Sequence, residues 1–162
     1  MAINKEKKKK IVNDVSDVLK GADSVVFVNF HGLPVADTTI LRKTLKGHGI
    51  GYLVSKNTLA KRALNDAKIE GALPSMEGEL ALAYGKDLIA PAREVYAFQK
   101  KYPNFIQIIG GIFEKRYMNK EEMTDIATIP TLRVLYGQVV NLINSPIQQF
   151  VMALGQIAKA KK

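Results

Sequence analysis

The sequence predicts an α/β fold: an N-terminal α/β sandwich with a central sheet of about four strands, followed by a C-terminal helical extension. Two observations predict it. Up to about residue 115, short β-branched and aromatic runs alternate with segments of helical period, which favours an α/β sandwich over an all-β fold. After Asn119 no strand pattern recurs. We therefore expect a domain over residues 1–118 and a helical region over residues 119–162.

Each expected element rests on a local signal. Ile11, Val15 and Leu19 recur at helical spacing, and Gly21 stands where that helix would end. The run SVVFVNF is rich in β-branched residues, as buried strands are. The expected elements, in chain order, are a helix over 5–20, a strand over 24–30, a helix from Pro34 to the pair Gly47 and Gly49, a strand over 50–55, a helix over 58–67, a strand over 79–85, a helix from Asp87 or Pro91 to Lys100, and a strand over 104–115.

The last expected strand contains two adjacent glycines, Gly110 and Gly111. Glycine weakens a strand interior, and it commonly marks a β-bulge or a close approach of two backbones. We expect one of these two features at this point of the sheet.

The C-terminal region has an apolar stripe and no strand pattern downstream to cover it. After a short helix over 120–130, apolar residues recur in steps of three and four. They stay in phase across Pro146, so either one helix kinks there or a second helix restarts in line. The stripe is either core, in a helix folded back on the domain, or a surface for another protein, and we expect the second. Its members are Leu132, Leu135, Val139, Ile143, Ile147, Phe150, Leu154 and Ile157, with Val151 beside them.

The chain is strongly basic. Its 24 Lys and Arg against 15 Asp and Glu give a net charge of +9, which in a small protein predicts a polyanionic partner, usually nucleic acid. An anionic membrane surface could use the same charge, but no apolar run approaches the ~20 residues of a spanning helix. The N-terminal residues lack the apolar core of a secretion signal. We expect a cytoplasmic protein with no membrane partner.

Signatures of enzymes, metal sites and cofactor sites are missing from the sequence. It has no GxGxxG motif, Walker loop or nucleophile elbow, and no cysteine for a disulfide, a thiolate metal site or catalysis. His31 and His48 each lie beside glycine in an expected turn, and no HxxxH or HxxE spacing is present to hold a metal. We therefore expect no catalysis, no metal, no cofactor and no small-molecule substrate.

The basic residues are better candidates for a binding site. The segment VSKNTLAKRAL joins a strand to a helix, and the free N–H groups and partial positive charge of a helix N-terminus suit a phosphate. Capping by Asn57 or Thr58 is the alternative, and the two are compatible because a cap fixes the turn from which Lys56 extends. The candidate nucleic-acid-binding residues are Lys7, Lys8, His31, Arg42, Lys43, Lys56, Asn57, Thr58, Lys61 and Arg62.

Several motifs occur together in one order. They are the K-N-T-L turn, the L-R-K of the second helix, the I-P-T before the last helix and the segment SPIQQFV within it. With VVFVNFHGLPV, ELALAYG and GGIFEKR, they span nearly the whole chain. In this order they resemble the bacterial large-subunit ribosomal stalk-anchor family (large-subunit ribosomal protein ten).

The resemblance implies a structural ribosomal protein of the large subunit. In that family the N-terminal domain binds large-subunit ribosomal RNA beside a neighbouring stalk-base protein. The C-terminal helix carries dimers of the acidic stalk protein, which recruit GTP-hydrolysing translation factors. Some members also bind their own messenger and repress its translation. The residues that would hold the stalk dimers here are Ile143, Ile147, Phe150, Val151, Leu154 and Ile157.

Two departures from the family pattern affect the expected RNA contact of His31 and the expected number of stalk dimers. Family members often carry Tyr-Arg-Gly or a similar basic triplet where this chain has Phe30, His31 and Gly32, so a neutral His31 would lose a phosphate contact. The single clear copy of SPIQQFVMAL predicts a number of stalk dimers at the low end for the family. The alternative functions are a free RNA-binding translational regulator that self-associates through its C-terminal helix, and a small enzyme, which would need a polar cleft.

Overall fold

The structure is a computed structural model that describes residues 5–66, 69–71, 74–76 and 78–160. The chain divides into two compact units, one ending at Ile129 and the other beginning at Pro130. The first unit holds a sheet and its covering helices, and the second holds one long helix.

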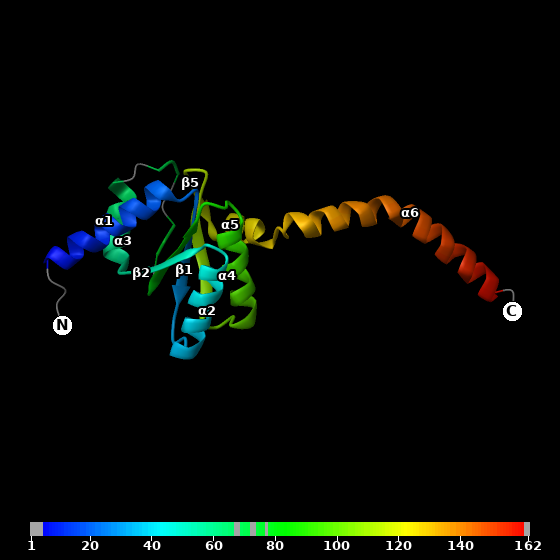
Figure 1. Cartoon of the computed structure of the whole chain (residues 1–162), viewed down its shortest axis with the longest axis horizontal. Coiled ribbons are helices and arrows are strands. Elements are labelled where there is room, and N and C mark those ends of the chain that lie inside the picture. The colour runs from blue at the N-terminus through cyan, green and yellow to red at the C-terminus, as the bar shows by residue number, and fades with distance from the viewer. Residues whose placement is uncertain (1–4, 67–68, 72–73, 77, 161–162) are drawn as a thin grey trace. The chain divides into compact units, whose positions relative to one another are not determined.

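The first unit confirms the predicted α/β fold. Its sheet is antiparallel throughout, and its strands lie in the order β2-β3-β1-β4-β5 (Figure 1). The elements in chain order are α1 (Lys5–Gly21), β1 (Ser24–Phe30), α2 (Val35–Gly47), β2 (Gly51–Ser55), α3 (Asn57–Asp66), β3 (Leu80–Gly85), α4 (Ala90–Lys101), β4 (Ile106–Phe113), β5 (Arg116–Asn119), α5 (Lys120–Thr128) and α6 (Leu132–Ala160).

Both faces of the sheet are covered by helices. Successive side chains of a strand point to opposite faces, so Val26 and Val28 of β1 pack with α2, α4 and α5, whereas Val25 and Phe27 pack with α1 and α3. Figure 1 shows these two groups of helices on opposite sides of the sheet. All four side chains are almost completely buried, which explains why β1 reads as a continuous apolar run.

A β-bulge in β4 accounts for the glycine pair. Phe27 is paired with Gly110 and Val28 with Ile108, so β4 has one extra residue between these pairs. The extra residue reverses the alternation, and Ile108 therefore packs with α2 and α4 whereas Ile112 packs with α1 and α3. A Cβ atom at Gly111 would collide with the carbonyl oxygen of Val25. The expected bulge and the expected close approach are both present.

The fifth strand was not expected from the sequence. β4 and β5 are joined by a two-residue turn, in which Glu114 and Lys115 have positive φ values of 49° and 64°. Such turns usually contain asparagine or glycine. The residues Glu-Lys give no turn signal, so the expected strand extends through them to residue 115, and residues 116–119 belong to no expected element.

Helix α5 belongs to the first unit. Its first turn is fixed by a hydrogen bond from the backbone N–H of Asn119 to the Glu122 carboxylate, 2.9 Å long. Met123 and Ala127 are buried in the same cluster as α4. The boundary between the compact units thus falls after Ile129, later than the change in composition at residue 119 indicated.

The second unit consists of helix α6, and Pro146 lies inside it. Of the two arrangements expected at this proline, the structure shows one continuous helix, which bends along its length in Figure 1. Proline lacks the N–H for the helical hydrogen bond and its ring displaces the preceding turn, so a bend is its usual effect. Within the described chain no single helix has both the length and the apolar composition of a membrane span. Helices α5 and α6 meet both criteria only when they are counted together across the bend between them.

Candidate nucleic-acid interface

Five of the candidate cations of the first unit lie on the two helices next to β2 in the chain or at the end of β2, which forms one edge of the sheet. Helix α2 precedes β2 in the chain and packs against it, and α3 follows directly after Lys56. The sequence therefore brings basic side chains of two helices to one edge of the sheet. We call the following residues the β2-edge cations: Arg42, Lys43, Lys56, Lys61 and Arg62.

The start of α3 differs from the expected cap. The backbone carbonyl of Lys56 accepts hydrogen bonds from the N–H groups of Leu59 and Ala60, at 2.9 and 3.0 Å, so Lys56 occupies the cap position. Neither Asn57 nor Thr58 makes a side-chain cap hydrogen bond within the described residues. The N-terminus of α3 therefore presents backbone N–H groups without a side-chain cap in this part of the chain, as an anion site requires.

Asn57 has an internal contact instead. Its side-chain nitrogen donates to the carbonyl oxygens of Gly78, at 2.7 Å, and Met76, at 3.4 Å. These bonds tie the chain before β3 to the turn after β2. Asn57 is half-buried, and its amide holds the position of the turn from which the adjacent Lys56 extends.

The β2-edge cations carry no internal counter-charge. Arg42, Lys43, Lys56 and Arg62 are exposed and Lys61 is half-buried. Among the described residues, ion pairs within 4.0 Å occur only at Glu94. Unpaired, solvent-facing cations gathered at one edge are suited to phosphate groups, because no protein carboxylate has to be displaced.

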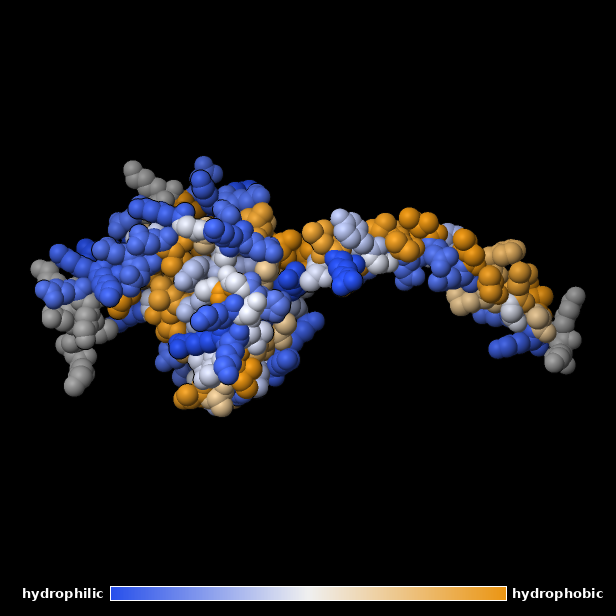
Figure 2. All heavy atoms as spheres, viewed as in Figure 1, coloured by the Kyte–Doolittle hydropathy of each residue, from blue (hydrophilic) through white to orange (hydrophobic). Residues whose placement is uncertain are grey.

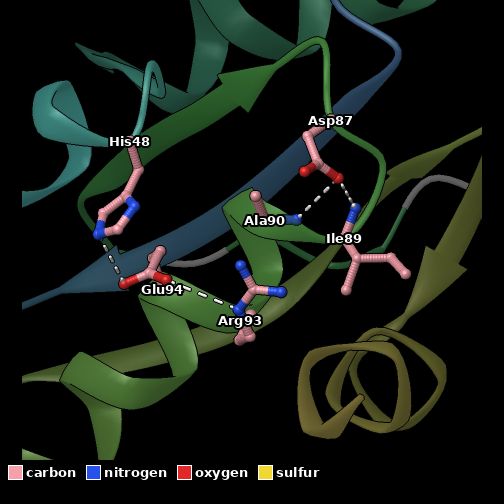
Figure 3. A network of polar contacts seen from close by, with 6 residues as sticks. All are labelled: His48, Asp87, Ile89, Ala90, Arg93 and Glu94. Carbon is pink, nitrogen blue, oxygen red and sulfur yellow. Dashed lines mark hydrogen bonds and ion pairs between the residues drawn. The ribbon is translucent and has the colours of Figure 1, made fainter. Parts of the chain in front are cut away.

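Glu94 of α4 contacts His48, which caps the end of α2, and Arg93 of α4 itself (Figure 3). One carboxylate oxygen is 3.8 Å from Nε2 of His48, and the other is 3.6 Å from Nε of Arg93. Nearby, the Asp87 carboxylate accepts the N–H of Ile89 at 3.1 Å, just before α4 begins. His48 thus has a carboxylate neighbour within its own unit, unlike the β2-edge cations in the described part of the chain.

His31 lies at the same end of the sheet as Lys56. Asn29 of β1 and Ser55 of β2 both pair with Leu80, so these two strands end together. The side chain of His31 is exposed, and its backbone N–H donates to the carbonyl of Phe105 at 2.9 Å.

The first helix carries the remaining candidates. Lys8 is exposed on α1, which packs against α3. The side chain of Lys7 lies outside the described part of the structure. Lys8 therefore belongs to the layer that also contains Lys61 and Arg62, although it is separate from the β2 edge itself.

One contact at the edge had no counterpart among the sequence predictions. The guanidinium carbon of Arg42 lies 5.6 Å from the centre of the Tyr52 ring, within cation–π range. Burial raises the pKa of the Tyr52 phenol to about 12, although the positive charge of Arg42 opposes that shift. An aromatic residue in the strand directly after a basic helix was the available signal for this pair.

A cleft with a volume of about 1280 Å³ lies on the α1 and α3 side of the sheet. Its charged residues are balanced in sign, which suits a polyanion less well than the β2 edge does. They are Lys20, Lys86, Lys115 and Arg116 against Asp23, Asp66, Glu70 and Glu114. Across the described ranges, no three His, Cys, Asp or Glu side chains lie close enough to hold a metal ion.

Helix α6 offers a different kind of surface. None of its residues is buried. The exposed fractions of the expected partner-binding side chains run from 51% at Leu154 to 72% at Ile143. Figure 2 shows apolar side chains along α6. The expected partner-binding residues are thus all exposed: Ile143, Ile147, Phe150, Val151, Leu154 and Ile157.

Comparison with known proteins identifies the family of this chain. The family model described as ribosomal protein L10 matches residues 3–100, which include the whole β2 edge. The chain belongs to the ribosomal protein L10 family. The resemblance seen in the sequence motifs is therefore confirmed.

Individual relatives extend the match beyond the family model. The large ribosomal subunit protein uL10 of Staphylococcus carnosus is 32% identical over 97% of this chain and 95% of its own length. The uL10 protein of Carboxydothermus hydrogenoformans is 36% identical over 92% of this chain and 85% of its own length. Matches of this extent include α6 as well as the sheet, so both units have counterparts in L10 proteins.

Proposed function

We propose that this L10-family protein is an adaptor: its first unit binds large-subunit ribosomal RNA through the β2-edge cations, and α6 holds dimers of the acidic stalk protein. The coarser part of this function follows from family membership. L10 proteins are structural components of the large ribosomal subunit, which in bacteria is cytoplasmic, and they are not enzymes. The dimers would recruit GTP-hydrolysing translation factors, and a neighbouring stalk-base protein would lie beside the RNA.

The observation that supports RNA binding most directly is the unpaired state of the β2-edge cations in the described chain. Each contact between such a cation and a phosphate releases condensed counterions from the RNA. Thr58 and His31 lie at the end of the sheet where Lys56 extends, and their exposed side chains can donate hydrogen bonds to phosphate or sugar oxygens, whereas Asn57 would act by holding the turn.

The support for stalk-protein binding is the exposed apolar stripe of α6. Burying a large apolar side chain stabilises a complex by about 1.5–3 kcal/mol before ordering costs, and several such side chains in one groove give a stable complex. Dimers of an acidic protein also complement the basic residue of the last turn, Lys159. Self-association of α6 is the alternative occupant, and it would favour a free translational regulator that can repress its own messenger.

A chain ending at Pro130 separates the two surfaces. We expect it to melt cooperatively and to bind large-subunit ribosomal RNA with an affinity within about two-fold of the full chain, because it keeps the compact first unit and all of the β2-edge cations. It should not retain acidic stalk dimers in size-exclusion chromatography. Aggregation of the shortened chain would mean that α6 is core, and stalk dimers that stay bound would place their site in the first unit.

A further inference from the structure

Arg42 differs from the other β2-edge cations because it has an aromatic neighbour. Its guanidinium lies 5.6 Å from the centre of the Tyr52 ring. The pair joins α2, which carries Arg42, to β2, which carries Tyr52. Tyr52 is itself half-buried and packs against the cluster that contains α2 and α4. The ring is therefore a fixed platform rather than a mobile surface side chain.

The contact leaves the hydrogen-bonding edge of the guanidinium available. The guanidinium carries five N–H donors in a planar fork, and a single ring that approaches it from one side leaves donors free on the other. No carboxylate lies within 4.0 Å of Arg42 in the described residues. A phosphate can thus be bound by two parallel N–H groups while the ring stays in place.

We propose that Tyr52 is a positioning residue for RNA binding, because its ring holds the Arg42 guanidinium in the orientation in which it takes a backbone phosphate. This inference rests on the proposed RNA binding and assigns a role to a residue that does not itself contact RNA. A free arginine loses side-chain entropy when it binds, and an arginine already ordered on a ring loses less.

The chemistry of Tyr52 supports this role. Burial raises the pKa of its phenol to about 12, so the side chain is neutral at any pH at which RNA is stable. A phenolate would form an ion pair with Arg42 and compete with phosphate for its charge. A neutral ring attracts the guanidinium through its π face and leaves the positive charge for the RNA.

The test is a double-mutant cycle in the full chain, with a large-subunit ribosomal RNA transcript as the probe. Tyr52→Leu should weaken binding about two- to five-fold, the range of an exposed cation–π pair. Tyr52→Phe keeps the ring and should bind RNA as tightly as the unmodified chain. In the Arg42→Ala background, Tyr52→Leu should change the affinity no further, because the group that the ring positions is already gone.

Each other outcome has a separate meaning. If Tyr52→Leu weakens binding equally with and without Arg42, Tyr52 acts only through folding and the proposal is overturned; melting curves of all variants measure that effect directly. No effect of Tyr52→Leu, or of Arg42→Ala, also overturns it. In these cases the unmodified chain still binds RNA, so the proposed function stands. Absence of RNA binding by the unmodified chain would instead overturn the proposed function.

Discussion

Replacing Phe150 and Leu154 with aspartate should raise the dissociation constant for acidic stalk dimers by about two to four powers of ten. Both side chains are more than half exposed on α6. Burial of two such residues contributes about 3–6 kcal/mol to a complex, and each factor of ten corresponds to about 1.4 kcal/mol. Isothermal titration calorimetry of the full chain with purified stalk protein would measure the change.

A matched pair on the opposite side of α6 controls for charge. Gln149→Asp with Gln156→Asp adds the same two negative charges, and by helical spacing these positions lie away from the stripe. All four positions are exposed, so neither pair should alter the melting temperature of the first unit. Equal losses of affinity in the two variants would show that repulsion from the acidic partner, and not the apolar stripe, decides the binding.

Replacing Lys56 and Arg62 with alanine should weaken binding to large-subunit ribosomal RNA and flatten its salt dependence. Both cations are exposed and lack a carboxylate partner in the described chain, so the substitutions remove no internal ion pair. Each lost phosphate contact reduces the slope of log K against log salt by about 0.7–0.9, which gives a reduction of nearly two units for the pair. Filter binding over a series of salt concentrations would measure the slope.

The control for this variant removes two cations at a distance from β2. Arg116 begins β5, which forms the edge of the sheet opposite β2, and Lys120 begins α5, which packs against β4 and β5. Both side chains are exposed, so Arg116→Ala with Lys120→Ala lowers the net charge by the same amount. The control should keep the original slope. If it loses as much slope as the first pair, RNA is attracted by the overall charge and the β2 edge has no special role.

The sequence was most informative where side-chain period and burial coincide. In β1 both faces are buried, and in α6 the stripe has a helical period, so both elements could be predicted. Strand β5 could not be predicted, because the turn that leads into it uses Glu114 and Lys115 in place of asparagine or glycine. The compact first unit extends to Ile129, beyond the change in composition at residue 119, because the packing of α5 on α4 depends on contacts distant in sequence.

The candidate interface shows the same limit. The clustering of basic residues around β2 could be predicted, because α2, β2 and α3 are consecutive in the chain. The role of Asn57 could not, since its hydrogen bonds go to Gly78 and Met76, about twenty residues further along the chain. The same holds for Arg42 and Tyr52, whose contact requires α2 to pack on β2 in one particular way. The roles of the basic residues, Asn57 and Tyr52 in RNA binding stay predictions.

The central claim is that one chain holds RNA and stalk dimers at the same time on separate surfaces. Size-exclusion chromatography with light scattering tests it directly, on a mixture of the full chain, a large-subunit ribosomal RNA transcript and acidic stalk protein. The predicted result is a single complex that contains all three components, with the affinity for RNA changed by no more than about two-fold when the dimers are bound. Displacement of the dimers by RNA, or a complex of RNA with a self-associated chain that excludes the dimers, would contradict it.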